Sequence, residues 1–340
     1  MLATAEQYAA MLDAASVGKY ALPAVNVTSS QTLNGTMRGL AEAGADGIIQ
    51  VTTGAADYLS GAAKDMALGA RALAEYARIL ADRYPVLIAL HTDHAPPEKF
   101  DAFVRPLIEE SRRRRERGEQ PLFHSHMFDG STLPLAENLN FSAQLLDELA
   151  PLEVVLEVES GVVGGEEDGI AGPEAGRSEL YTTTNDLMQV VDALGAGDRG
   201  RYLLAATFGN VHGVYAPGNV KLRPEVLRDG QLALAEKRPG ARFQYVFHGS
   251  SGSEPDQVHE AIANGVVKIN LDTDAQYAFT RAIADHIFTN YDGVLRVDGD
   301  VGRKSAYDPR AWGRKAEAAL SQRVAEASEL FGAAGKSIVR

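Results

Sequence analysis

Apolar residues along this chain gather in eight short runs, and longer segments with helical periodicity separate most of these runs. The runs are rich in Val, Ile and Leu, which is typical of strands that are buried on both faces. They cover residues 22–26, 47–52, 86–92, 122–127, 152–159, 202–208, 244–248 and 266–271. The helical segments include 62–82, 135–149 and 256–263. Strands that alternate with helices predict an α/β fold of parallel βαβ units, and eight units predict a (β/α)8 barrel, or TIM barrel, with a doubly wound sheet as the alternative.

The C-terminal part of the chain has a helical pattern of its own. Asp308 and Pro309 are typical of an N-cap and of a first helical position. One helical stripe then carries Ala316, Leu320, Val324, Ala327 and Phe331. The stripe packs either on the barrel or against another subunit. Because no repeat or linker interrupts the sequence, we expect a single barrel domain over residues 1–340, in which about 290–340 form a C-terminal helical extension.

Composition and charge narrow the classes of function. The chain has 33 basic and 46 acidic residues and a net charge of −13, which is the opposite of the balance in most nucleic-acid binders. Its one basic cluster, SRRRRERG at 111–118, is interpreted as the solvated end of an amphipathic helix. No run reaches the roughly 18 apolar residues of a membrane span, and the N-terminal segment lacks the pattern of a signal peptide. We therefore expect a cytoplasmic protein that binds neither nucleic acid nor membrane.

Five of the eight predicted strands end in titratable or glycine-rich residues. In a barrel the carboxyl ends of the strands meet at one mouth, where active sites lie. The chain has no cysteine, which leaves His, Asp and Glu as the metal ligands available. His94, His212 and His248 follow three separate strands, and three imidazoles with an open fourth position are a known catalytic zinc arrangement. Spacing alone does not choose between His91 and His94.

Anion-binding and acid–base groups occupy further strand ends. The segment HGSSGS at 248–253 precedes a helix and offers backbone N–H groups to a phosphate, and NLDTD at 270–274 adds polar side chains on the next strand. Asp93 lies beside a candidate metal ligand, where a carboxylate can reach a substrate hydroxyl. The acidic segment VVGGEEDG at 162–169 is, from its residues alone, either an exposed turn, which we favour, or a mobile loop that carries an acid.

Several motifs together resemble one family. They are, in order, ALPAVNV, LHTDHA, SHMFDGS, LEVESGVVGGEEDG, FGNVHGVYAPGNVKL, FHGSSGS, VVKINLDTD and YDPR. From about residue 20 to the tail, the chain resembles the class II, metal-dependent fructose-bisphosphate aldolases in their long-chain, actinobacterial-like form. The resemblance implies a (β/α)8 barrel and a homodimer or homotetramer. It also implies reversible cleavage of fructose 1,6-bisphosphate to dihydroxyacetone phosphate and glyceraldehyde 3-phosphate in glycolysis and gluconeogenesis.

The resemblance further implies catalytic and metal-binding roles. Asp93 would act as acid and base at the C4 hydroxyl of the substrate. Glu167 would exchange the proton at the carbon that becomes the nucleophile, which reverses our interpretation of its segment as an exposed turn. One catalytic Zn2+ per subunit would be held by His94, His212 and His248. A second metal position would lie at Glu159.

Ligand positions follow from the same resemblance. A monovalent cation, K+ or Na+, would lie at Val211, Gly213 and Ser251. The phosphosugar substrate would contact Asn26, Thr52, Gly213, Gly249, Ser251, Asn270, Asp272, Thr273 and Arg310. In this family the arginine comes from a neighbouring subunit.

Some positions depart from the family pattern and leave the substrate open. Ser250 stands where glycine is expected, and Thr52 and Ala55 lie in QVTTGAA, which replaces a Q-F-S-x-G-G pattern. Tagatose 1,6-bisphosphate is therefore the alternative substrate. The residues also leave open a Schiff-base aldolase that uses Lys268, a metal-dependent hydrolase, and a phosphosugar-binding protein without catalysis.

Overall fold

Eight parallel strands close into a barrel, which confirms the (β/α)8 prediction. The computed structural model describes residues 1–161, 164–167, 170–171, 181–212, 222–295 and 302–339, and it describes only the backbone of 164–167, 170–171 and 212. The barrel strands are β1 (Leu22–Asn26), β2 (Gly47–Val51), β3 (Ile88–Ala95), β4 (Ser125–Phe128), β5 (Val155–Ser160), β8 (Tyr202–Ala206), β10 (Tyr245–Phe247) and β11 (Val266–Leu271). They neighbour one another in chain order, and β11 pairs with β1 to close the barrel.

Helices surround the barrel and close one end of it. They are α1 (Ala5–Gly18), α2 (Ser30–Ala43), α3 (Thr53–Leu59), α4 (Met66–Ala81), α5 (Pro97–Glu116), α6 (Leu135–Leu149), α7 (Thr184–Leu194), α8 (Glu225–Lys237), α9 (Pro255–Ala263), α10 (Thr273–Thr289), α11 (Tyr291–Val294), α12 (Lys304–Tyr307) and α13 (Pro309–Leu330), with short 3-10 helices η1 (Gly61–Ala63) and η2 (Ala150–Leu152). The predicted helical segments 62–82, 135–149 and 256–263 correspond to α4, α6 and α9.

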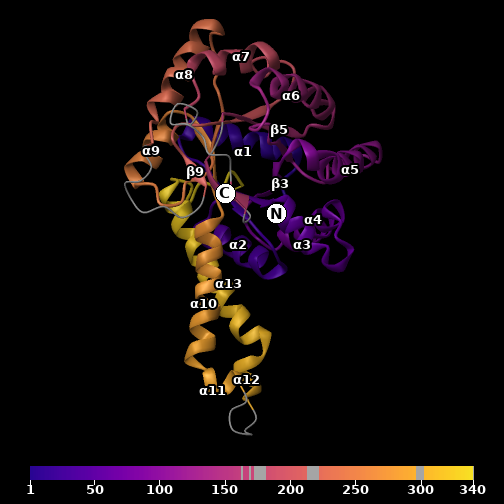
Figure 1. Ribbon diagram of the computed structural model, residues 1–340, viewed down its shortest axis with the longest axis vertical. Coiled ribbons are helices and arrows are strands. Elements are labelled where there is room, and N and C mark those ends of the chain that lie inside the picture. The colour runs from indigo at the N-terminus through magenta and orange to yellow at the C-terminus, as the bar shows by residue number, and fades with distance from the viewer. Residues whose placement is uncertain (162–163, 168–169, 172–180, 213–221, 296–301, 340) are drawn as a thin grey trace.

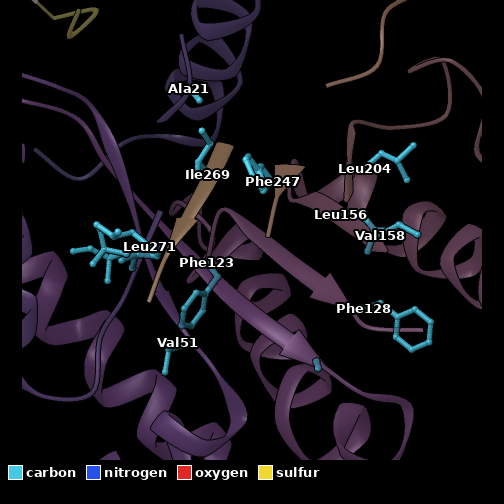
Figure 2. Close-up of a cluster of buried hydrophobic side chains, with 14 of the residues drawn as sticks. Ala21, Val51, Phe123, Phe128, Leu156, Val158, Leu204, Phe247, Ile269 and Leu271 are labelled. Carbon is cyan, nitrogen blue, oxygen red and sulfur yellow. The ribbon is translucent and has the colours of Figure 1, made fainter. Parts of the chain in front are cut away.

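Two buried apolar clusters explain this arrangement. The larger one lies between strands and outer helices, and Figure 2 shows Leu156, Leu204 and Phe247 in it on neighbouring strands. In the second cluster, Met11 and Leu12 of α1 pack against side chains near the starts of the barrel strands. Since α1 fills the amino end of the barrel, the carboxyl mouth is the end left for a site.

The C-terminal helices form an arm that extends from the barrel (Figure 1). Asp308 caps α13 by accepting a hydrogen bond from the Arg310 backbone, as predicted, and the apolar stripe of α13 is buried. The stripe packs within the chain on α2, where a Cβ at Gly39 would lie 2.5 Å from the Ser321 carbonyl oxygen. Helix α10 follows directly after β11 and packs against α13. The single-domain organisation stays a prediction.

The basic cluster forms the end of α5 and is paired with acidic side chains. Arg112 lies 3.0 Å from Glu148, and Arg114 contacts both Glu75 and Glu110. Arg114 is buried, so the interpretation of the whole cluster as a solvated helix end is wrong for this residue. Among the described residues, no helix has both the length and the apolar character that crossing a bilayer requires.

Candidate active site

Strand β3 delivers Asp93 and His94 to the same site although they are adjacent in sequence. Neighbouring residues of a regular strand point to opposite faces. Here the β3–β4 register breaks after Thr92, and His94 has a φ of +40°, in the left-handed region that non-glycine residues rarely adopt. Strained backbone of this kind is concentrated at functional sites. The break turns both side chains toward one point, so both neighbouring residues reach the same site.

Among the side chains that the structure describes, three groups have ligand atoms within 4.8 Å of one another. They are Asp93, His94 and His248; His91, Asp93 and Glu157; and His94, Asp129 and Glu159. His94 and His248 belong to one group, and their rings lie 4.7 Å apart between centroids. His91 instead contacts Ser125 through Nδ1 at 2.8 Å. The geometry therefore brings His94, rather than His91, to His248.

The protonation states in these groups suit a cation. Burial lowers the pKa of His248 despite its hydrogen bond to Glu157, which favours the neutral imidazole that binds metals. Burial alone would raise the pKa of Asp129, but its hydrogen bond with His94 and the His94 charge outweigh burial, so the pKa is lowered. Imidazole nitrogens and carboxylate oxygens together are the donor set that Zn2+ takes when no thiolate is present.

Asp129 and Glu159 flank His94 on its other side. The Asp129 Oδ2 atom lies 3.0 Å from His94 Nδ1, and Glu159 Oε2 lies 3.8 Å from the same nitrogen. Glu159 was predicted, whereas Asp129 was missed. Asp129 directly follows β4, so the rule that polar residues at strand ends form the site would have found it.

Three amide side chains surround the Asp93 carboxylate. Asn26 and Gln50 donate to Oδ2 at 3.0 and 2.9 Å, and Asn270 donates to Oδ1 at 3.3 Å. Burial alone would raise the pKa of Asp93, but nearby His94, together with other cationic groups, holds it well below its usual value. Asp93 is therefore an ionised acceptor. Asn26 and Asn270 were predicted at the site, and Gln50 was missed.

The segment after β10 adopts a conformation that requires glycine at its start. Gly249 has a φ of +63°, and a Cβ there would lie 2.3 Å from the Val211 carbonyl oxygen. The Ser250 hydroxyl points toward β11 and donates a hydrogen bond to the backbone carbonyl of Asn270 at 2.9 Å. This bond holds the loop beside the start of α10, where Asp272 and Thr273 lie. Ser251 is partly exposed in the same loop.

A small sheet of three strands brings the acidic segment next to another predicted ligand. Strand β6 (Gly164–Glu167) pairs with β7 (Ile170–Ala171) and with β9 (Val211–His212), so that Gly165 lies opposite His212. The segment is thus not a simple exposed turn. The side chains of Glu167 and His212, and Gly213 altogether, lie outside the described residues.

Thr52 and Arg310 are two further residues predicted to contact the substrate. The buried Thr52 hydroxyl caps α3 by accepting a hydrogen bond from the Ala55 backbone. Arg310 is exposed and pairs with Asp308 at 2.6 Å. It lies in the first turn of α13, directly after α12, which lies at the far end of the arm from the barrel (Figure 1). The chain therefore does not bring Arg310 to its own barrel mouth.

Fold and site together define a (β/α)8 barrel of the metal-dependent class, with imidazoles and carboxylates gathered at the carboxyl mouth. The chain belongs to the family described as fructose-bisphosphate aldolase class-II, whose profile matches residues 6–336.

Similar proteins agree with this assignment over the full length. The chain is 55% identical to a fructose-bisphosphate aldolase of Mycobacterium leprae and 55% identical to one of Streptomyces galbus, with 99% of each chain covered in both cases. Among solved structures, a fructose-bisphosphate aldolase of Campylobacter jejuni is similar with a TM-score of 0.85 at 34% identity. That match covers 98% of this chain and 97% of the other.

Proposed function

We propose that the chain catalyses the reversible cleavage of fructose 1,6-bisphosphate to dihydroxyacetone phosphate and glyceraldehyde 3-phosphate in the cytoplasm. The observation that carries this proposal is the convergence of Asp93, His94 and His248 within 4.8 Å in a chain of this family. The cleavage removes a proton from a hydroxyl and leaves negative charge on carbon. A carboxylate can accept the proton, and a metal bound beside it can stabilise the charge.

We assign two metal positions from this donor set. His94 and His248, with His212 from β9, would hold the catalytic Zn2+, and Asp129 and Glu159 beside His94 would hold a second position. When bound, Zn2+ supplies Lewis-acid chemistry at the ketone end of the substrate.

The carboxylates carry the proton transfers. Asp93 accepts the proton of the C4 hydroxyl while the C3–C4 bond breaks, so that C4 becomes the aldehyde carbonyl and the electron pair stays with C3. Glu167 then delivers a proton to C3, which completes dihydroxyacetone phosphate. The three amides around Asp93 hold its carboxylate in position before substrate arrives.

Replacing Glu167 by alanine is expected to leave bound zinc unchanged. It should slow exchange of the hydroxymethyl proton of dihydroxyacetone phosphate by about 10²-fold or more, since general acid–base groups contribute roughly 10²–10⁴-fold. Deuterium incorporation in D2O, followed by NMR, measures this exchange. Exchange at the parent rate would remove Glu167 from the mechanism.

The phosphate groups supply binding energy away from the reacting carbons. The phosphate of the ketone half would bind near the start of α10, at Gly249, Ser251, Asn270, Asp272 and Thr273. Gly213 would contribute to the same phosphate site. Asn26 and Thr52 add further substrate contacts. A K+ or Na+ ion at Val211, Gly213 and Ser251 would offset the phosphate charge.

Replacing Ser250 by alanine removes the bond that holds this loop to Asn270. A hydrogen bond of this kind contributes about 0.5–1.5 kcal/mol, so we expect KM to rise about two- to tenfold with little change in kcat. Steady-state kinetics of Ser250→Ala and Ser250→Gly measure the effect. A fall in KM in both variants would mean instead that the side chain crowds the phosphate.

A homo-oligomer, either a dimer or a tetramer, completes the proposal. The arm exposes large aromatic side chains, including Tyr277 at 66% and Phe288 at 77%. Arg310 lies far from its own barrel mouth, so it would bind the second phosphate in a neighbouring subunit. Light scattering coupled to size exclusion measures the assembly, and a monomer with full activity would contradict this role of Arg310.

The test of the function is a coupled cleavage assay on protein as purified, after chelator, and after Zn2+ is added back. Loss and recovery of fructose 1,6-bisphosphate cleavage support the metal mechanism, and activity that ignores chelator contradicts it. The same assay with tagatose 1,6-bisphosphate decides the sugar, because the two substrates differ only at C4.

A further inference from the structure

Lys268 on β11 is a fully buried cation inside the barrel, and no proton transfer of the proposed reaction uses it. Lysine is almost never fully buried unless it is paired. Its Nζ lies 2.9 and 3.1 Å from the two Glu157 carboxylate oxygens and 2.8 Å from Asn270 Oδ1. One ammonium group thus contacts two different side chains of the site.

The first contact leads to the metal ligand His248. Glu157 is fully buried on β5, and its Oε1 lies 2.8 Å from His248 Nε2. An ionised carboxylate can only accept, so Nε2 of His248 carries the ring proton. The other ring nitrogen of His248, Nδ1, then carries the lone pair that can bind a metal. It lies 3.9 Å from Oε2 of Glu159. Carboxylates that hold the second nitrogen of a metal-binding histidine set its tautomer and raise its basicity.

The second contact leads to the acid–base group Asp93. An ammonium group only donates, so the Asn270 atom that faces Lys268 must be the carbonyl Oδ1. The amide nitrogen of Asn270 therefore points the other way and donates to Asp93 at 3.3 Å. The Lys268 ammonium and the Asp93 carboxylate thus favour the same orientation of the amide, with Oδ1 toward the cation and the nitrogen toward the anion.

We propose that Lys268 is a positioning residue that sets both halves of the site: it holds His248 through Glu157 and Asp93 through Asn270. This inference rests on the proposed metal site. Lys268 is not placed to act as a Schiff-base nucleophile, because its nitrogen is enclosed and bonded to three acceptor atoms.

The test removes both charges of the ion pair together, in the double variant Lys268→Met/Glu157→Gln. Replacing a buried pair as a unit leaves no unpaired charge, so the metal-free protein should unfold near the parent temperature. We expect its Zn2+ dissociation constant, from chelator competition, to rise about 10–100-fold. The absorption spectrum of the Co2+-substituted form should change as well. Glu157→Asp keeps the charge beside Lys268 but shortens its reach to His248, so it should show a smaller loss of the same kind even if the double variant fails to fold.

Two controls make the outcomes distinct. Arg114→Met/Glu75→Gln removes a partly buried ion pair outside the barrel and should keep parent zinc affinity. If folded Lys268→Met/Glu157→Gln and Glu157→Asp both keep the zinc affinity and the cobalt spectrum of the parent, the positioning role of Lys268 is wrong. The proposed metal site would still stand. Parent zinc affinity in His248→Ala would overturn the metal site, and the inference with it. A borohydride-trapped covalent adduct on Lys268 would overturn the positioning role directly.

Discussion

Replacing His94 by alanine is expected to abolish both bound zinc and cleavage of fructose 1,6-bisphosphate. His94 is the one residue shared by the group with Asp93 and His248 and the group with Asp129 and Glu159, so the change removes a ligand from both metal positions. Lewis-acid stabilisation is worth several kcal/mol of barrier. Since each 1.36 kcal/mol is tenfold in rate, kcat should fall by about 10³-fold or more.

The measurement pairs metal content with the coupled assay, and two controls separate ligand loss from structural damage. His94→Asn tolerates the positive φ at this position better than alanine does, so it keeps the backbone while it removes the imidazole. His259→Ala, an exposed histidine on α9, should retain zinc and activity. A folded His94→Ala enzyme with full zinc content would show that His94 is not a ligand.

The fold could be predicted from sequence because each barrel strand is buried on both faces. Such strands are continuous apolar runs, and the helices between them keep a 3.6-residue period. The error at β3 is instructive: the apolar run ends near Thr92, but the strand continues through Ala95. The polar residues at the end of β3 are buried because they contact side chains from other strands. The hydropathy of the sequence does not predict such contacts.

The sequence predicts a site residue only where the strand topology by itself fixes the position of that residue. The rule that strand ends converge found Asp93, His94 and His248. It could not choose His94 over His91, because that choice depends on one positive φ and a local register break. The ion pair of Lys268 with Glu157 was beyond sequence, since β11 and β5 are separated by β10 and β8 in the barrel and meet only across its interior.

Replacing Asp93 by asparagine is expected to lower kcat for cleavage about 10²–10⁴-fold while zinc stays bound. Asparagine keeps the size of the side chain but loses the negative charge and one of the two acceptor oxygens that face Asn26, Gln50 and Asn270. It therefore cannot take the C4 hydroxyl proton. The variant is cleaner than alanine, which would leave three buried amide donors without an acceptor.

The decisive measurement compares cleavage with proton exchange in the same protein. Exchange at the hydroxymethyl carbon of dihydroxyacetone phosphate needs Glu167 but not Asp93, so Asp93→Asn should keep this exchange while it loses cleavage. Glu167→Ala should lose the exchange. A kcat within tenfold of the parent would exclude Asp93 as the base. Loss of zinc together with exchange would instead make Asp93 a metal ligand, which its place in the group with His94 and His248 also permits. The opposite behaviour of the two variants thus distinguishes the roles of the two carboxylates, which act on the two carbons of the bond that breaks.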